Sequence, residues 1–374
     1  MGGRLPGRFL IPERSFMSTE LTPFENLAGS QDPGARLAGV ATRPAGFEAL
    51  LGRARRVLAS VPGDGDFIAN GIWGMDLAAL MASRRDELFV LDVRAREEYD
   101  AGHIEGAVHV EFSELALAEG LDMFPKERKI IVVCQAGSLS AQAVSSLRLL
   151  GYDAAMLRTG MNGWAPGPGR EEALAVIEAA AFPVIQAPPL PCAALEAAGA
   201  FDQPAADERE AVLARLREQM QLARTAGARV TAAGLAGADE AGFAPVADVA
   251  GVIGPEQLHR ALLDSDASEQ LFLLDLRREE DFEGVGHIDG AVRMDFDAAL
   301  LPENLEQLPN GRKIITICYS GNMAAQLAQV LRLLGHDAAV LAYGMVGWKR
   351  TPTTYLYLKD LQKGDYPVVS SRRP

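Results

Sequence analysis

The chain repeats its own sequence at a fixed offset, and this feature constrains the fold more than any other. The segment LRLLGYDAAMLRTGMNGW at 147–164 recurs as LRLLGHDAAVLAYGMVGW at 331–348, an offset of 331 − 147 = 184 residues. The same offset relates KIIVVCQAG to KIITICYSG, GHIEGAV to GHIDGAV, and FPVI to YPVV. A repeat that keeps its register over such a length indicates two copies of one domain. The length of 374 residues also suits two or three domains better than one.

Within the first copy, short apolar runs alternate with helical patterns. Strands are predicted at 88–93 (LFVLDV), 130–134 (IIVVC) and 154–157 (AAML), and an amphipathic helix at 141–150. A PVI segment is expected to close each copy. Continuous apolar strands between helices are typical of a parallel sheet that is covered on both faces. The sequence therefore predicts an α/β fold with two tandem domains, each a parallel sheet with helices on both faces.

The domain boundaries follow from the repeat and from local composition. Apolar residues at three- and four-residue intervals predict a leading helix ahead of each copy, at 46–61 and 208–223. The segment between the copies is rich in Pro and Ala and has weak periodicity, which is typical of a linker. We expect a loosely ordered N-terminal segment over 1–43, a first domain over 44–186, a linker over 187–207 and a second domain over 208–370.

Net charge, apolar run length and cysteine content limit the partners and the cellular compartment that we expect for the protein. The net charge of −14 argues against a nucleic-acid partner, which would require clustered Lys and Arg. No apolar run is long enough to span a bilayer or to serve as a secretory signal, so we expect a cytoplasmic protein; an organelle-targeting segment is the alternative. Either Met1 or Met17 could be the true start. Cys134, Cys192 and Cys318 lie far apart without metal-ligand spacing, which favours a reducing compartment.

Two of these cysteines occupy the same position in the repeat. Cys134 and Cys318 each end a predicted strand and precede a short glycine-containing loop and a helix, so they should lie at the carboxyl edge of a sheet, where α/β folds bind ligands. The helices are expected to begin near Ser138 and near Asn322, and their N-termini to favour the thiolate and to lower the pKa of both thiols. Gly137 and Gly321 would let successive amides turn inward around an anion. The alternative is a pair of ordinary buried cysteines. Cys192 is interpreted as an incidental linker thiol.

Three motifs in order carry a resemblance to a known family. LDVRAREEYDAGHIEGAVHV, IIVVCQAG and GMNGW resemble the rhodanese domain, and LDLRREEDFEGVGHIDGAVRM, IITICYSG and GMVGW repeat the pattern. The resemblance covers about 71–186 and 251–370. It implies a sulfurtransferase that moves a sulfane sulfur from thiosulfate, mercaptopyruvate or a persulfide to cyanide, a thiol or a partner protein. Cys134 and Cys318 would carry the sulfur as a persulfide, and no metal or organic cofactor would be required.

The resemblance also assigns roles to the two loops. The residues after each cysteine would supply the amides around the persulfide. They are Gln135, Ala136, Gly137, Ser138, Leu139 and Ser140 in the first copy, and Tyr319, Ser320, Gly321, Asn322, Met323 and Ala324 in the second. Phosphatase and arsenate-reductase relatives need a longer loop with an arginine. The sixth residue after each cysteine is Ser140 or Ala324 and not an arginine. Phosphate chemistry is therefore disfavoured.

The loops lack a cation that many thiosulfate-using relatives carry. Arg94 and Arg277, which follow the LDV and LDL runs, are the best remaining candidates for contact with an anionic donor. The alternative is a salt bridge with a nearby acid such as Glu97 or Glu280. The donor therefore stays open.

The remaining polar residues of the motifs are expected to be structural. Asp92 and Asp275 could cap the next turn or orient the arginine. His103 and His287 titrate in the right range for a base, but their place in a turn motif favours a structural hydrogen bond.

A different class of function also fits the sequence. The chain could be a non-catalytic binding module, or a redox or sulfide sensor, that uses the rhodanese fold while its cysteines stay idle or become oxidised. Two-domain members often keep the cysteine only in the C-terminal copy, whereas both copies keep it here.

Overall fold

The computed structural model describes residues 44–60, 70–116, 121, 123–186, 203–225, 251–350, 354–363 and 366–370. The predictions for the first 43 residues, for Cys192 and for most of the linker fall outside these ranges.

Each copy folds into a five-stranded sheet in which every neighbouring pair of strands is parallel. In the first sheet the order is β1 (Gly71–Ile72), β5 (Ala154–Leu157), β4 (Lys129–Val133), β2 (Leu88–Asp92) and β3 (Val108–His109). In the second sheet it is β6 (Val252–Ile253), β10 (Ala338–Leu341), β9 (Lys313–Ile317), β7 (Leu271–Asp275) and β8 (Val292–Arg293). The predicted fold class is confirmed.

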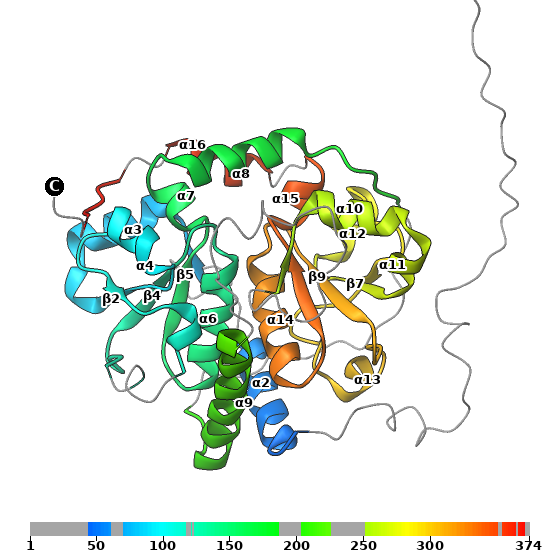
Figure 1. Cartoon of the computed structure of the whole chain (residues 1–374), viewed down its shortest axis with the longest axis horizontal. Coiled ribbons are helices and arrows are strands. Elements are labelled where there is room, and N and C mark those ends of the chain that lie inside the picture. The colour runs from blue at the N-terminus through cyan, green and yellow to red at the C-terminus, as the bar shows by residue number, and fades with distance from the viewer. Residues whose placement is uncertain are drawn as a thin grey trace, which may run out of the picture. The chain divides into compact units, whose positions relative to one another are not determined.

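Helices cover both faces of each sheet (Figure 1). The helices of the first repeat are α2 (Phe47–Ala59), α3 (Gly74–Ser83), α4 (Arg96–Ala101), α6 (Ser138–Leu149), α7 (Gly160–Trp164) and α8 (Pro168–Ala179). Those of the second are α9 (Ala206–Thr225), α10 (Pro255–Leu263), α11 (Ser265–Glu269), α12 (Glu279–Gly284), α13 (Pro302–Leu305), α14 (Asn322–Leu333), α15 (Gly344–Trp348) and α16 (Thr354–Lys363). Of these, α8 and α16 pack on other helices. Short 3₁₀ turns lie at Arg85–Glu87 and Phe112–Glu114.

The continuous apolar sequence of the central strands follows from this layering. On β4, Ile130 and Val132 pack in the cluster that contains α6, whereas Ile131 and Val133 pack in the cluster that contains α3 and α7. All four side chains are fully buried. Because both faces of the strand are covered, no polar alternation marks it. The two-residue edge strands β1, β3, β6 and β8 are too short to produce a pattern, and the sequence does not predict them.

The two repeats share one large apolar core. This core joins α6 and α14 and also takes in Leu50 of the leading helix α2 and Val212 of the leading helix α9. Buried polar groups bridge the same helices, since the Ser145 hydroxyl donates to the carbonyl of Gln326 at 3.0 Å. Each leading helix therefore contributes to a core that belongs to both copies.

The closing segments, residues 181–186 and 366–370, cross between the repeats. Ile185 pairs antiparallel with His287 of the second repeat, and Val369 pairs with His103 of the first. The expectation that each PVI segment closes its own copy is wrong. The adjoining helices also contact the other repeat, because α8 packs on α15 as well as on α7 of its own repeat, and α16 packs on α7.

Two tryptophans fix this exchange. The indole Nε1 of Trp164 donates to the carbonyl of Pro367 at 2.9 Å, and that of Trp348 donates to the carbonyl of Pro183 at the same distance. A buried indole requires an acceptor. Each repeat supplies this acceptor from its closing segment to the indole of the other repeat.

Candidate functional site

Cys134 lies at the carboxyl end of β4, next to the N-terminus of α6. The amide of Gly137 donates to its Sγ at 3.1 Å, and Sγ lies 3.3 Å from the hydroxyl of Ser140. The same hydroxyl donates to the carbonyl of Gly137 at 2.9 Å. Only 3% of the cysteine is exposed. The loop therefore surrounds a buried sulfur with one backbone donor and one hydroxyl that can rotate toward it.

Gly137 makes this close turn possible. Its φ of 97° lies in the left-handed region, and a Cβ added there would be 2.1 Å from the carbonyl oxygen of Arg158. Any side chain would thus push the loop away from β5. The side-chain amide of Asn322, in the second loop, donates to the same carbonyl at 3.1 Å. The first residue of α14 therefore lies beside the first loop.

Cys318 occupies the equivalent place after β9 and is 2% exposed. The amide of Ala324 donates to its Sγ at 3.4 Å, and the amides of Ser320, Gly321 and Met323 also act on the sulfur. Burial nevertheless raises the pKa of the Cys318 thiol above its usual range, and the four amides lower it by less. The predicted lowering of the pKa is wrong for Cys318, because the loss of hydration outweighs the donors at the helix N-terminus.

The GMNGW and GMVGW motifs form hydrogen bonds with the backbone of the two cysteine loops. The amide of Met161 donates to the carbonyl of Cys134, and the amide of Met345 donates to the carbonyl of Cys318, both at 2.9 Å. A Cβ at Gly160 would lie 2.3 Å from the Cys134 carbonyl, and the motif has left-handed backbone at this glycine. Sequence reasoning missed this role. The recurrence of the motif at a constant distance from the cysteine was the available signal.

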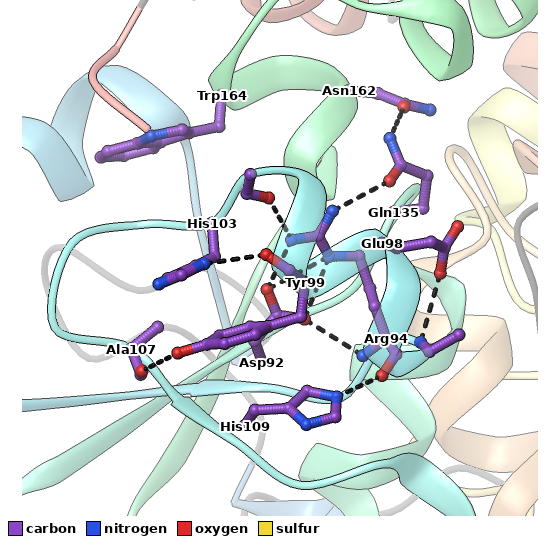
Figure 2. A network of polar contacts seen from close by, with 12 residues as sticks. Asp92, Arg94, Glu98, Tyr99, His103, Ala107, His109, Gln135, Asn162 and Trp164 are labelled. Atoms are coloured by element: carbon purple, nitrogen blue, oxygen red, sulfur yellow. Dashed lines mark hydrogen bonds and ion pairs between the residues drawn. The ribbon is translucent and has the colours of Figure 1, made fainter. Parts of the chain in front are cut away.

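Figure 2 shows the surroundings of Arg94. Its guanidinium is almost fully buried and forms an ion pair with Asp92 at 2.7 Å. It also donates to the carbonyl of Gly102 at 2.7 Å and to the side-chain oxygen of Gln135 at 3.4 Å. Gln135 in turn donates to Asn162 at 2.6 Å. The salt-bridge alternative is observed, with Asp92 as the partner in place of Glu97.

Arg277 repeats the arrangement in the second copy. It pairs with Asp275 at 2.7 Å and donates to the carbonyl of Gly286 at 2.9 Å. The partner is again the aspartate two residues earlier, in place of Glu280. Here the residue after the cysteine is Tyr319, whose hydroxyl donates to Asp281 at 2.5 Å. Burial and this carboxylate raise the pKa of Tyr319 to about 12.

The motif histidines are tied to turns, as expected. His103 Nδ1 is hydrogen-bonded to the carbonyl of Tyr99 at 2.8 Å, and its ring stacks on that of Tyr99 (Figure 2). His287 Nδ1 is hydrogen-bonded to the carbonyl of Phe282 at 3.0 Å, with the rings stacked. Both histidines are buried. These contacts orient the turn and leave each ring beside an aromatic neighbour.

The remaining loop residues pack against apolar surroundings. Leu139 and Met323 border the shared core. Ala136 borders a smaller cluster that contains Tyr343 of the second repeat, and burial, with Glu172 and Cys134 nearby, raises the pKa of Tyr343. The structure thus brings the loop residues of each copy together around its own cysteine, with a side chain from the second copy close to the first loop.

The described residues contain no group of three or more His, Cys, Asp or Glu side chains that could hold a metal ion. Over the same part of the chain, every helix is too short or too polar to cross a membrane.

Both copies match a known domain family. The model of the rhodanese-like domain matches residues 76–166 and 255–351, which together make up just over half of the chain. The human thiosulfate:glutathione sulfurtransferase is 37% identical over 94 residues, which cover 21% of this chain and 78% of that protein. The probable adenylyltransferase/sulfurtransferase MoeZ of Mycobacterium tuberculosis is 35% identical over 80 residues, which cover 21% of this chain and 20% of MoeZ.

Solved structures give weaker matches. A thiosulfate sulfurtransferase from Pseudomonas aeruginosa is 19% identical with a TM-score of 0.27, and the match covers 87% of this chain and 50% of that one. A rhodanese-related protein from Thermoplasma volcanium is 30% identical with a TM-score of 0.21 and covers 22% and 82% of the two chains. The chain spans about a fifth of the length of the first curated relatives it matches.

Two sheets of the same order, a cysteine loop at the same strand end of each, and a family model that matches both copies lead to one conclusion: the chain belongs to the rhodanese-like domain family and carries two such domains in tandem.

Proposed function

We propose that the chain is a sulfurtransferase that carries sulfur as a persulfide on Cys134 and Cys318. The observation that supports this most directly is that backbone amides of each loop point at the sulfur: one amide at Cys134, and four at Cys318. Donors placed around a single buried sulfur can stabilise a thiolate and the terminal sulfur of a persulfide. An ordinary core cysteine has no need of such donors.

The proposed reaction has two balanced steps. In the first, the cysteine thiolate attacks the outer sulfur of a sulfane donor; an S–S bond forms to the cysteine, and the bond inside the donor breaks. With thiosulfate the leaving group is sulfite, which takes the electron pair. In the second, a nucleophile such as cyanide or a thiolate attacks the outer sulfur and releases the cysteine thiolate. No net oxidant or reductant is needed.

The acceptor is proposed to be a thiol or a partner protein. The human relative is named for thiosulfate and glutathione, and it matches within a single domain. The thiols of Cys134 and Cys318 are unpaired with any other cysteine in the described structure, which fits a reducing compartment such as the cytoplasm.

The two arginines are proposed to position the loops and to add positive potential near an anionic donor. Arg94 reaches the first loop through Gln135 at 3.4 Å, the longest of its hydrogen bonds given above. Release of that bond would free Nη1 to bind an anionic donor. Arg277 donates instead to the carbonyl of Asp281 at 3.4 Å and is 1% exposed, so its influence on a donor acts through Tyr319 and Asp281.

Intact mass measurement tests the proposal. The protein is mixed with thiosulfate, mercaptopyruvate or polysulfide, and the wild type is compared with Cys134→Ala and Cys318→Ala. We expect each single variant to gain about 32 Da, one sulfur atom bound to a reactive thiolate, and the double variant to gain none. Cyanide should remove the added mass.

The result that would overturn the proposal is the absence of a cyanide-removable adduct on either cysteine with all three donors. Such a protein would be a binding or sensing module on the same fold.

A further inference from the structure

Each closing segment contacts the cysteine site of the other repeat through a short chain of hydrogen bonds. Val369 exchanges two backbone hydrogen bonds with His103, both at 2.8 Å. The neighbouring carbonyl of Gly102 accepts from Arg94 at 2.7 Å, and Arg94 donates to Gln135, the residue after Cys134. The last residues of the second repeat thus connect to the first cysteine loop.

The second site is connected in the same way. Ile185 exchanges two backbone hydrogen bonds with His287, at 2.8 and 2.9 Å. The carbonyl of Gly286 accepts from Arg277, whose Nη1 donates to the carbonyl of Asp281. The carboxylate of Asp281 accepts from the hydroxyl of the residue after Cys318.

In the second repeat the closing segment 181–186 lies close against the turn that contains Gly286 and His287. A Cβ added at Gly286 would lie 2.9 Å from the carbonyl oxygen of Ile185 and 2.9 Å from the side chain of Val184. Gly286 has a φ of 99°, so the turn that binds the segment is fixed by this glycine. At Gly102 a Cβ would make only an ordinary contact with Val368, at 3.7 Å.

We propose that each closing segment is a positioning element for the cysteine site of the other repeat: residues 366–370 for Cys134, and residues 181–186 for Cys318. The inference rests on the proposed function, since its effect is measured as sulfur transfer. Its physical basis is that the segment fixes the carbonyl of Gly102 or Gly286 and hence the guanidinium that accompanies it. Arg94 contacts the residue after Cys134 directly, and Arg277 is linked to the residue after Cys318 through Asp281.

The test uses two proteins in which a single site remains. Cys318→Ala reports Cys134 alone, and Cys134→Ala reports Cys318 alone. Into each we introduce Val369→Pro or Ile185→Pro, which removes the backbone N–H that donates to His103 or His287. Single-turnover transfer from polysulfide to cyanide is then measured.

We expect Val369→Pro to slow transfer at Cys134 about tenfold and to leave Cys318 within about twofold, because a misplacement of a reacting group by about 1 Å can cost about 100-fold and a smaller shift costs less. Ile185→Pro should give the reverse pattern. If the segments only stabilised the fold, each proline would slow transfer at both cysteines. If each segment served its own repeat, Val369→Pro would slow transfer at Cys318 and Ile185→Pro would slow it at Cys134. Either outcome overturns the inference.

Two further variants protect the test against misfolding. Val369→Ala keeps the N–H, and its side chain is 37% exposed, so transfer at Cys134 should stay near that of the parent. A chain that ends at Lys363 lacks the segment without introducing proline, and it should reproduce the loss at Cys134 alone. If the parent proteins take up no sulfur at all, the proposed function has failed; if they do and the pattern is not crossed, only this inference has.

Discussion

Substitution of Gly344 by alanine should displace the Cys318 loop, because the added Cβ would collide with the loop backbone. Gly344 begins α15 with a φ of 52°, and a Cβ there would lie 2.4 Å from the carbonyl oxygen of Cys318 and 2.7 Å from the amide nitrogen of Gly321. Real Cβ atoms do not approach other atoms closer than 3.0 Å, so the loop or the helix must move by at least 3.0 − 2.4 = 0.6 Å.

The expected effects follow from that displacement. A residue other than glycine in the left-handed region costs about 1–3 kcal/mol, so the free energy of unfolding should fall by this amount. A shift of this size in a loop that holds the reacting sulfur should slow transfer by about tenfold. In the Cys134→Ala background, urea unfolding and single-turnover release of thiocyanate measure the two effects.

Gly284 provides the matched control. A Cβ there would meet nothing within 4 Å, and its φ is not positive. Gly284→Ala should therefore leave both the unfolding free energy and the transfer rate near those of the parent. If Gly344→Ala behaves as this control does, the close approach of α15 does not hold the loop, and the account of the GMVGW motif given above is wrong.

Three other perturbations test separate parts of the site. Burial raises the pKa of the Cys318 thiol, so its thiolate fraction should keep rising above the usual cysteine pKa of about 8.5. The rate of persulfide formation in Cys134→Ala should therefore still increase past that pH, and a plateau by pH 8 would contradict the raised pKa. Ser140→Ala removes the hydroxyl 3.3 Å from the sulfur of Cys134 and should slow transfer there about tenfold, measured in Cys318→Ala. Asp275→Asn leaves the buried charge of Arg277 uncompensated and should lower the free energy of unfolding by about 3 kcal/mol in urea, whereas a loss below about 1 kcal/mol would refute the reasoning.

The central part of the fold could be predicted from the sequence because its signals are local. Predicted strands at 130–134 and 154–157 coincide with β4 and β5 within one residue, and the helices predicted to begin near Ser138 and Asn322 are α6 and α14, which begin at these residues. Edge strands of two residues leave no pattern to detect. The positions of the two cysteines at strand ends likewise follow from the apolar run and the glycine after it.

The partners of the arginines were left open by the sequence. It allowed Arg94 and Arg277 to contact an anionic donor or a nearby acid such as Glu97 or Glu280, and it allowed Asp92 and Asp275 to orient them. In the structure each arginine pairs with the aspartate that ends the preceding strand. An extended residue places its side chain on the same face as the side chain two positions away, and this geometry decides the pair. The raised pKa of Cys318 was missed because burial depends on every neighbour of the sulfur in space.

The sequence by itself determined that the chain holds two copies of one α/β domain and that a cysteine ends the same strand in each, because both facts lie in the register of the repeat. Only the tertiary structure decided against which copy each closing segment packs. The turns GHIEGAV and GHIDGAV are nearly identical, so the sequence of a closing segment fits either one. The choice is made by the shared core of α6 and α14, which brings the two repeats together so that Ile185 binds His287 and Val369 binds His103.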